Sequence, residues 1–228
     1  MTVLVQQPPT STWSMYRAIV GIGALCGLLI VTVYQTTAAR IQQNQERFLA
    51  QAVSQVLPEA RSTLGVAATD NGGLENTAED LPLPVFLGYD ITGELIGAVI
   101  TAEGMGYQDK IRVLYAYSFD RDAITGFKIL DSKETPGLGD RVEKEPHFLA
   151  NFDRLDATLA PGGRSLLHPI VTVKQGQKTN PWEIDGITGA TITSEAIGNI
   201  LNDSASIWAP VLERNAQNFA TVDPVEDL

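Results

Sequence analysis

Hydroxyl side chains gather around a Gly-Ala pair in the segment DGITGATITS, which runs from Asp185 to Ser194. Gly186, Gly189 and Ala190 have little or no side chain, so the phosphate of another molecule can approach the backbone closely. A helical pattern starts near Ser194, a good N-cap residue, and the free N–H groups at a helix start favour a phosphate by about 0.3 to 1 kcal/mol. The segment therefore predicts a phosphate-binding turn at the start of a helix.

This turn does not match the common nucleotide-binding loops. It lacks the lysine and the spacing of a Walker P-loop, and it has no GxGxxG pattern, so an exchangeable nucleotide is poorly supported. A threonine at a helix start also serves simply to cap the helix. The hydroxyls therefore need an explanation from the rest of the chain.

Composition limits the kind of protein and the binding partners to which this turn can belong. The 228 residues suffice for one compact domain with appendages. Lys and Arg number 16 against 27 Asp and Glu, a net charge of -11, and such an acidic surface repels DNA and RNA, which we exclude as partners. The single cysteine, Cys26, forms no internal disulfide, and two histidines without an accompanying cluster predict no metal site.

An uncharged apolar segment extends from Ala18 to Tyr34. Its Ile, Leu and Val residues, at about -0.3 to -0.6 kcal/mol each, favour membrane insertion. We predict a single transmembrane anchor at residues 18–37 after a cytoplasmic tail at residues 1–17. A cleaved signal peptide is the alternative, because Thr37-Ala38-Ala39 offers small residues to a peptidase, although the apolar segment exceeds the usual h-region of about 7 to 15 residues.

The charges beside this segment do not orient it in the membrane. Arg17 precedes it, whereas Arg40 and Arg47 follow it, so the positive-inside rule gives no direction. Beyond it, residues 38–84 are predicted to form a juxtamembrane helix, which ends near Pro58, and then a linker rich in Gly, Asn, Asp and Pro.

The folded domain is predicted at residues 85–212, with a C-terminal tail at residues 213–228. VFLGYD and ELIGAVIT flank a short turn, and IRVLYAYS and FKILDS flank FDRDAITG, so both pairs are predicted to be hairpins. Helical patterns follow in EPHFLANFDRL and SEAIGNILNDSASIWAPVL, with the strand-like RSLLHPIVTVK between them. Runs of strands with segregated helices predict an α+β domain, a largely antiparallel sheet with packed helices.

Three segments, taken in order, resemble one known family. DGITGATITS resembles the flavinylation motif of the FMN-binding domain family, an Asp followed by Gly-Ala-Thr. KETPGLGDRV, from Lys133 to Val142, resembles the ETPGLG segment of that family. GMGYQDKIRVL resembles the start of the strand that precedes that segment in the family. With the N-terminal anchor, they resemble the G subunits of the Rnf ion-translocating electron transport complex over nearly the whole chain. The C subunits of the sodium-pumping NADH:quinone reductase share the motif and the anchor but usually carry a longer domain.

The resemblance implies a covalently attached FMN. In this family a separate flavin transferase uses FAD and Mg²⁺, and the last threonine of the motif, here Thr191, attacks the phosphorus of the FMN half and releases AMP. A phosphoester tether leaves the isoalloxazine ring unaltered, so the flavin still accepts electrons and cannot diffuse away. Asp185 either orients the acceptor or helps the transferase to recognise the loop, or it is only a turn carboxylate.

The resemblance also implies which residues surround the FMN. Leu138 is expected to pack on the ring face, with glycine amides near the polar edge of the ring, although TPGLG as a plain turn needs no function. Aromatic candidates for stacking on the ring, or for filling the core, are Tyr107, Tyr115, Tyr117 and Trp182. The predicted cofactor-binding residues are Thr191, Thr188, Gly189, Ala190, Thr193, Ser194, Asp185, Glu134, Thr135, Pro136, Gly137, Leu138 and Gly139.

Location and partners follow from the same resemblance. It implies a single-pass protein of the bacterial inner membrane with its C-terminal domain in the periplasm, in contact with the other Rnf subunits and, during maturation, with the flavin transferase. It also implies an electron carrier between ferredoxin and NAD⁺ that is not catalytic alone. The alternatives are a membrane-anchored binding or sensory domain without redox activity and a stand-alone flavoprotein reductase.

Overall fold

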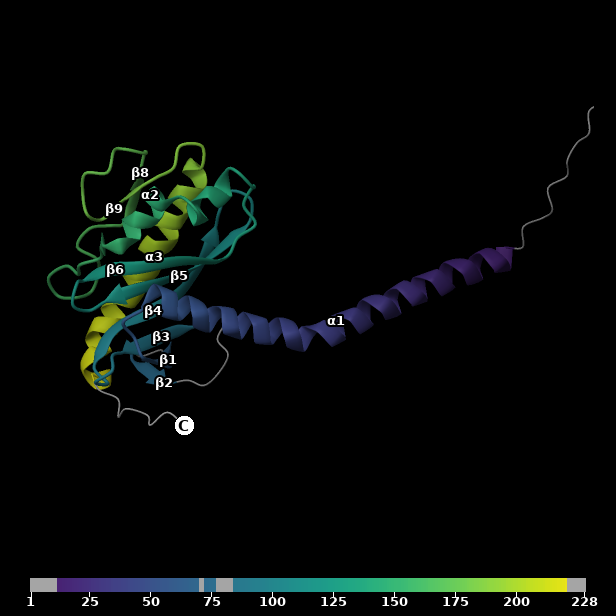
Figure 1. Cartoon of the computed structure of the whole chain (residues 1–228), viewed down its shortest axis with the longest axis horizontal. Coiled ribbons are helices and arrows are strands. Elements are labelled where there is room, and N and C mark those ends of the chain that lie inside the picture. The colour runs from purple at the N-terminus through teal and green to yellow at the C-terminus, as the bar shows by residue number, and fades with distance from the viewer. Residues whose placement is uncertain (1–11, 70–71, 77–83, 221–228) are drawn as a thin grey trace, which may run out of the picture. The chain divides into compact units, whose positions relative to one another are not determined.

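The computed structural model describes residues 12–69, 72–76 and 84–220 (Figure 1). Parts of the predicted tails at residues 1–17 and 213–228, and of the predicted linker, lie outside these ranges. The chain divides after Phe48 into two compact units. The first unit contains most of a long helix, and the second contains a sheet and its packed helices.

Helix α1 runs without a break through Thr12–Val56 and includes the predicted anchor. It is long and apolar enough to cross a membrane, and its apolar side chains around Leu28 and Leu29 are exposed. The hydroxyls of Thr32 and Thr37 donate hydrogen bonds of 2.7 Å to helix carbonyls, so these polar groups are satisfied within the helix. The segment is therefore compatible with a single-pass membrane anchor.

The second unit is built on a seven-stranded antiparallel sheet, which confirms the predicted α+β class. The strand order is β2-β1-β3-β4-β5-β6-β7. Both predicted hairpins are present, as β3 with β4 and β5 with β6. The strands are β1 (Ser62–Ala68), β2 (Leu74–Asn76), β3 (Val85–Tyr89), β4 (Leu95–Met105), β5 (Lys110–Ser118), β6 (Ala123–Asp131) and β7 (Leu155–Asp156).

The sheet begins before residue 85, where we expected the domain to start. Strand β1 pairs with β3 from Ser62 opposite Tyr89 to Val66 opposite Val85, and β2 pairs with β1. The sequence of β1, STLGVAA, is rich in small residues and Gly, which have low strand propensity. Its place in the sheet is therefore decided by pairing with β3 and not by its own pattern.

Both faces of the sheet are covered. On one face, Ile100, Val113 and Tyr115 share a core with helix α3 (Thr191–Asn215), which crosses this face in Figure 1. On the other face, Val99, Leu114 and Ala116 pack against Ala52, Val53 and Val56, near the end of α1. Neighbouring residues of one strand thus enter different cores, because side chains alternate across a sheet.

The helices and strands between β6 and α3 are shorter than predicted. The segment EPHFLANFDRL forms a single α-helical turn, α2 (Pro146–Leu149), between two 3-10 turns, η1 (Gly139–Glu143) and η2 (Ala150–Asp153). The Asn151 side chain donates to the Phe148 carbonyl (2.9 Å), a local bond that competes with helix continuation. Within RSLLHPIVTVK only β8 (Val171–Val173) is a strand, and it pairs in parallel with β9 (Glu183–Asp185). A last 3-10 turn, η3 (Ala216–Phe219), follows α3.

Candidate functional site

The turn between β9 and α3 presents Thr191 as the first residue of the helix. Gly189 adopts φ 87°, which glycine reaches without strain. Thr191 itself is exposed. The N-cap residue is Ala190 and no side chain caps this helix end, so amides of the first turn are left for another acceptor.

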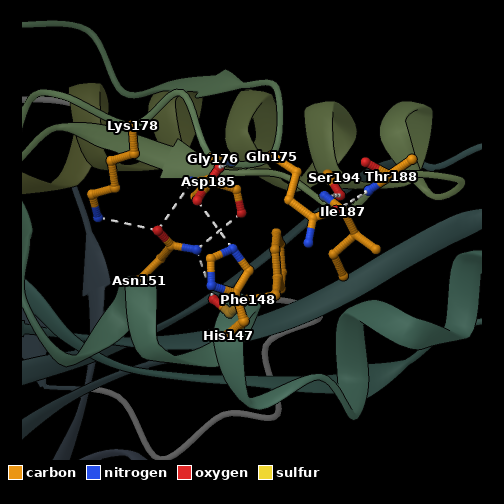
Figure 2. Close-up of polar contacts among 10 residues, drawn as sticks. All are labelled: His147, Phe148, Asn151, Gln175, Gly176, Lys178, Asp185, Ile187, Thr188 and Ser194. Atoms are coloured by element: carbon orange, nitrogen blue, oxygen red, sulfur yellow. Dashed lines mark hydrogen bonds and ion pairs between the residues drawn. The ribbon is translucent and has the colours of Figure 1, made fainter.

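Ser194 is not the N-cap that we predicted, because the helix begins earlier, at Thr191. Its buried hydroxyl donates to the Ala190 carbonyl (2.9 Å) and accepts from the Ile187 N–H (3.2 Å; Figure 2). The buried Ser194 hydroxyl therefore stabilises the turn from Ile187 to Ala190 through these two hydrogen bonds. A residue at N-cap geometry cannot be told from one in the first turn by its type alone, since serine suits both positions.

The backbone of Thr188 is held from two sides. Its N–H donates to the Gln175 side-chain oxygen (3.0 Å), and its carbonyl accepts from the Arg141 guanidinium (2.7 Å). Arg141 also pairs with Glu145. The turn is thereby tied to the loop after β8 and to η1, and the Thr191 side chain is left free at the surface.

A cavity of about 310 Å³ joins the two segments that the sequence analysis singled out. We call it the Leu138 cavity. Residues of the TPGLG loop form one wall, and the turn with the first residues of α3 forms another. Its lining residues are Tyr107, Glu134, Thr135, Leu138, Gly139, Gly189, Ala190, Thr191, Ile192 and Thr193.

The rim of the Leu138 cavity is apolar. Tyr107, Leu138 and Ile192 lie there with 65%, 53% and 55% of their surface exposed. Large exposed apolar side chains beside a concave site suit a flat aromatic ligand. We did not predict Ile192, because in the sequence it is an isolated apolar residue between two threonines.

The floor of the cavity contains the buried carboxylate of Glu134. One oxygen accepts from the Thr193 hydroxyl (2.7 Å), and the other accepts from the Gln108 N–H (3.0 Å). Gly106 and Gly139 pack so closely that a Cβ at either position would overlap this carboxylate. Glu134 thus joins the TPGLG loop to α3 and to the β4–β5 hairpin.

The TPGLG loop has a defined conformation of its own. Gly137 adopts φ 79°, and its N–H donates to the Asp140 carboxylate (2.6 Å). The hydrogen bond from Lys144 and that Gly137 amide lower the pKa of the Asp140 carboxyl. Pro136 and Gly137 do not line the cavity, so their part in this structure is to shape the loop.

A second cavity, of about 340 Å³, lies on the other side of Thr191. We call it the Lys174 cavity. It is more polar than the first and brings together Thr188 and Ser194 with residues of β8 and the loop after it. Its lining residues are Thr172, Val173, Lys174, Gln175, Gln177, Gly186, Ile187, Thr188, Thr191, Ser194 and Glu195.

Asp185 lines neither cavity. Its carboxylate accepts from the Gly176 N–H (2.6 Å) and lies 3.0 Å from His147 Nε2 (Figure 2). The Asn151 side chain bonds the Asp185 backbone twice, accepting from its N–H (2.9 Å) and donating to its carbonyl (3.1 Å). Asp185 therefore connects the start of the turn to the loop after β8 and to α2.

The other aromatic candidates are not at the cavity. Tyr115 and Tyr117 are buried in the core, where burial raises the pKa of both phenols. Trp182 stacks on His168, with ring centres 3.8 Å apart. Only Tyr107, among the four aromatic residues that we named, lines the Leu138 cavity.

The residues around Thr191 fit a flavin mononucleotide. The apolar rim suits the ring, while uncapped amides at the start of α3 suit a phosphate. Arg141, which we did not predict, adds a cation close to Gly189. Its position could have been suspected from the sequence, since it follows the TPGLG loop directly in KETPGLGDRV.

Known proteins share this sequence and fold. The FMN-binding domain family matches residues 106–206. The G subunit of the ion-translocating oxidoreductase complex of Methanosarcina acetivorans is 29% identical, covering 80% of this chain and 87% of that protein. The G subunit of the Na(+)-translocating ferredoxin:NAD(+) oxidoreductase complex of Acetobacterium woodii is 30% identical, covering 82% of this chain and 86% of that protein.

A solved structure, that of the C subunit of the Na(+)-translocating NADH-quinone reductase from Parabacteroides distasonis, has the same fold. It superposes with a TM-score of 0.57 at 21% identity and covers 76% of this chain and 96% of that chain. The fold is therefore common to both kinds of protein, while the sequence relation over most of both chains is to the G subunits. This chain belongs to the family of G subunits of ion-translocating (Rnf-type) oxidoreductase complexes, and it contains an FMN-binding domain.

Proposed function

We propose that this chain carries FMN esterified through its phosphate to Thr191 and relays electrons within an ion-translocating ferredoxin:NAD oxidoreductase complex. The observation that carries the proposal is the Leu138 cavity, in which Thr191, the uncapped start of α3 and the TPGLG loop meet. FMN supplies the electron-carrying chemistry, and the protein supplies the tether, the orientation and the electrostatic surroundings.

Thr191 is suited to be the attachment point. Its hydroxyl is exposed at the first position of a helix, where a transferase can reach it in line with a leaving group. In the proposed attachment step, the Thr191 oxygen would form the new bond to phosphorus. The bond between the FMN and AMP halves of FAD would break with AMP as the leaving group, and the threonine proton would be released. Thr193 and Ser194 are less suited, because both hydroxyls are buried and hydrogen-bonded.

The Leu138 cavity is proposed to receive the ring, and the amides at the start of α3 to face the phosphate. Leu138, Ile192 and Tyr107 would contact the ring faces. Thr135 is at the wall with its hydroxyl bonded to the Gln108 side chain (3.1 Å), and it can exchange this bond for one to the ligand. The Arg141 guanidinium contributes positive charge on the phosphate side.

The membrane setting completes the proposal. The anchor in α1 holds the domain at the bacterial inner membrane, with the domain in the periplasm, where a tether prevents loss of the flavin. Other subunits of the complex are its electron partners, and a flavin transferase matures it. Without them the chain does not oxidise NADH.

The test is covalent flavin on the full chain co-produced with its transferase. Flavin fluorescence is expected to persist on a denaturing gel and to be lost in Thr191→Val, while Thr63→Val, which changes an exposed threonine of β1, keeps it. Mass spectrometry should find the added FMN on the peptide that contains Thr191. Flavin on the Thr191→Val chain, or an unmodified natural chain, would refute the proposal.

A further inference from the structure

Glu134 stands out among the acidic residues of the described chain, because it is buried and lines a ligand cavity. Its exposed fraction is 6%, and Asp185, at 7%, is the other buried acid in the ranges that the structure describes. Asp185 faces His147 and lies outside both cavities. No Lys, Arg or His in those ranges forms an ion pair with Glu134. Its negative charge is therefore offset by hydrogen bonds alone.

Two hydrogen bonds fix the side chain of Glu134, one at each oxygen. The Thr193 hydroxyl donates to one oxygen at 2.7 Å, and the Gln108 N–H donates to the other at 3.0 Å. Gly106 and Gly139 also pack closely against the two oxygens of this group. These contacts hold the carboxyl group of Glu134 in one position at the floor of the Leu138 cavity.

A charge fixed in such a place affects the reduction of a flavin. A flavin that gains two electrons gains negative charge for each electron that is not matched by a proton. A buried carboxylate opposes that added charge more strongly than a surface carboxylate does, because water and salt screen it less. Reduction is thereby disfavoured.

From this placement we infer that Glu134 sets the midpoint potential of the flavin, holding it lower than the same cavity would with a neutral side chain. The inference rests on the proposed function and adds a role that differs from retention of the cofactor. Glu134 acts through its charge, whereas Thr191 acts through a covalent bond.

Glu134→Gln removes the charge and can keep the contacts. The glutamine oxygen can accept from the Gln108 N–H, and its amide can donate to the Thr193 oxygen, since a hydroxyl both donates and accepts. Glu195→Gln is the matched control, because it makes the same charge change at an exposed position of α3 beside Thr191, on the side of the Lys174 cavity.

The experiment is a reductive titration of the flavinylated full chain in detergent, with dithionite as the electron donor and flavin absorbance as the readout. Glu134→Gln is expected to move the midpoint potential in the positive direction, and Glu195→Gln to leave it near that of the natural chain. An unmoved potential in a flavin-bearing Glu134→Gln chain, or an equal shift in both variants, overturns the inference while leaving the proposed function intact. A natural chain without covalent flavin overturns the proposed function instead.

A second variant keeps the inference testable if Glu134→Gln does not fold. Thr193→Val removes one hydrogen bond that offsets the charge but leaves the carboxylate in place. The midpoint potential is then expected to move in the negative direction, opposite to the shift in Glu134→Gln. A positive shift or no shift in Thr193→Val contradicts the assignment.

Discussion

At the scale of single residues, the two ends of the segment from Asp185 to Thr191 have different surroundings. Thr191 is exposed between two cavities, whereas Asp185 is buried and bonded to Gly176 and His147. Asn151 holds the same backbone from the other side, and its oxygen also accepts from Lys178 (3.1 Å), a lysine whose pKa is lowered by burial. We therefore propose that Asp185 acts on Thr191 indirectly, by fixing the turn that presents it.

Replacing Asp185 tests this indirect role. Asp185→Ala removes the hydrogen bond from the Gly176 N–H to a charged group, which is worth about 1.5 to 3 kcal/mol, so the thermal unfolding temperature in detergent is expected to fall and flavin incorporation to fall with it. Asp185→Asn retains an oxygen for Gly176, so both losses are expected to be smaller. Asp131→Asn, at the exposed end of β6, is the control. An Asp185→Ala chain of unchanged stability that takes up no flavin would point instead to direct recognition by the transferase.

At the scale of elements, the sheet is a platform whose two faces carry different helices. The start of α3 reaches the TPGLG loop through the bond between Thr193 and Glu134. The end of α1 packs on the opposite face, where Gly88, Gly97 and Gly126 leave room for Val56 and Leu57. These glycines are positions of close approach, and a Cβ at Gly126 would overlap the Val56 carbonyl oxygen.

Gly126→Ala is therefore expected to destabilise the folded domain. Overpacking of this kind costs about 1 to 3 kcal/mol, and the effect should appear as a lower unfolding temperature of the full chain in detergent. The Leu138 cavity lies on other elements, so covalent flavin should still be incorporated. Asp131→Ala, on the same strand but exposed, should leave the unfolding temperature unchanged. Equal unfolding temperatures for the Gly126→Ala and natural chains would show that the end of α1 shifts freely on the sheet.

At the scale of the whole molecule, the chain joins an apolar helical segment to an FMN-binding domain. The apolar stretch and the juxtamembrane stretch form one continuous helix, which runs through Thr37-Ala38-Ala39, the cleavage site of the signal-peptide alternative. Under the proposed function, a retained anchor would keep the FMN-binding domain beside its electron partners in the membrane, which is the arrangement that an electron relay needs.

Charge placed inside the anchor tests retention in the membrane. An arginine near the centre of a transmembrane helix costs about 2.5 to 3.5 kcal/mol, so the double variant Leu28→Arg with Leu29→Arg is expected to leave the membrane fraction in a flotation assay. Gln42→Arg with Gln43→Arg, farther along the same helix, should float with the membranes as the natural chain does. A mature chain whose mass lacks the residues up to Ala39 would establish the signal-peptide alternative.

Local pattern was enough for much of this protein. Periodicity predicted the apolar helix, both hairpins and the α+β class. A helix or strand with buried side chains has apolar residues at a regular spacing, and this spacing is visible in a short stretch of sequence. The motif around Thr191 and the loop from Glu134 to Gly139 were also visible as segments, since glycines and hydroxyls at set spacings are local features. Strand β1 and the short elements between β6 and α3 were not predicted, because their conformation depends on partners distant in sequence.

The sequence alone determined which residue types surround Thr191 and that an apolar segment precedes the domain. Only the tertiary structure decided which of those residues meet. Glu134 contacts Thr193, Ile192 lines the Leu138 cavity, and Arg141 binds the Thr188 carbonyl beside it. Asp185 lies outside the cavity and contacts His147. The reason is that spacing along a chain constrains conformation over a few residues, whereas contacts across a sheet and between loops are selected by packing and hydrogen bonding over the whole fold.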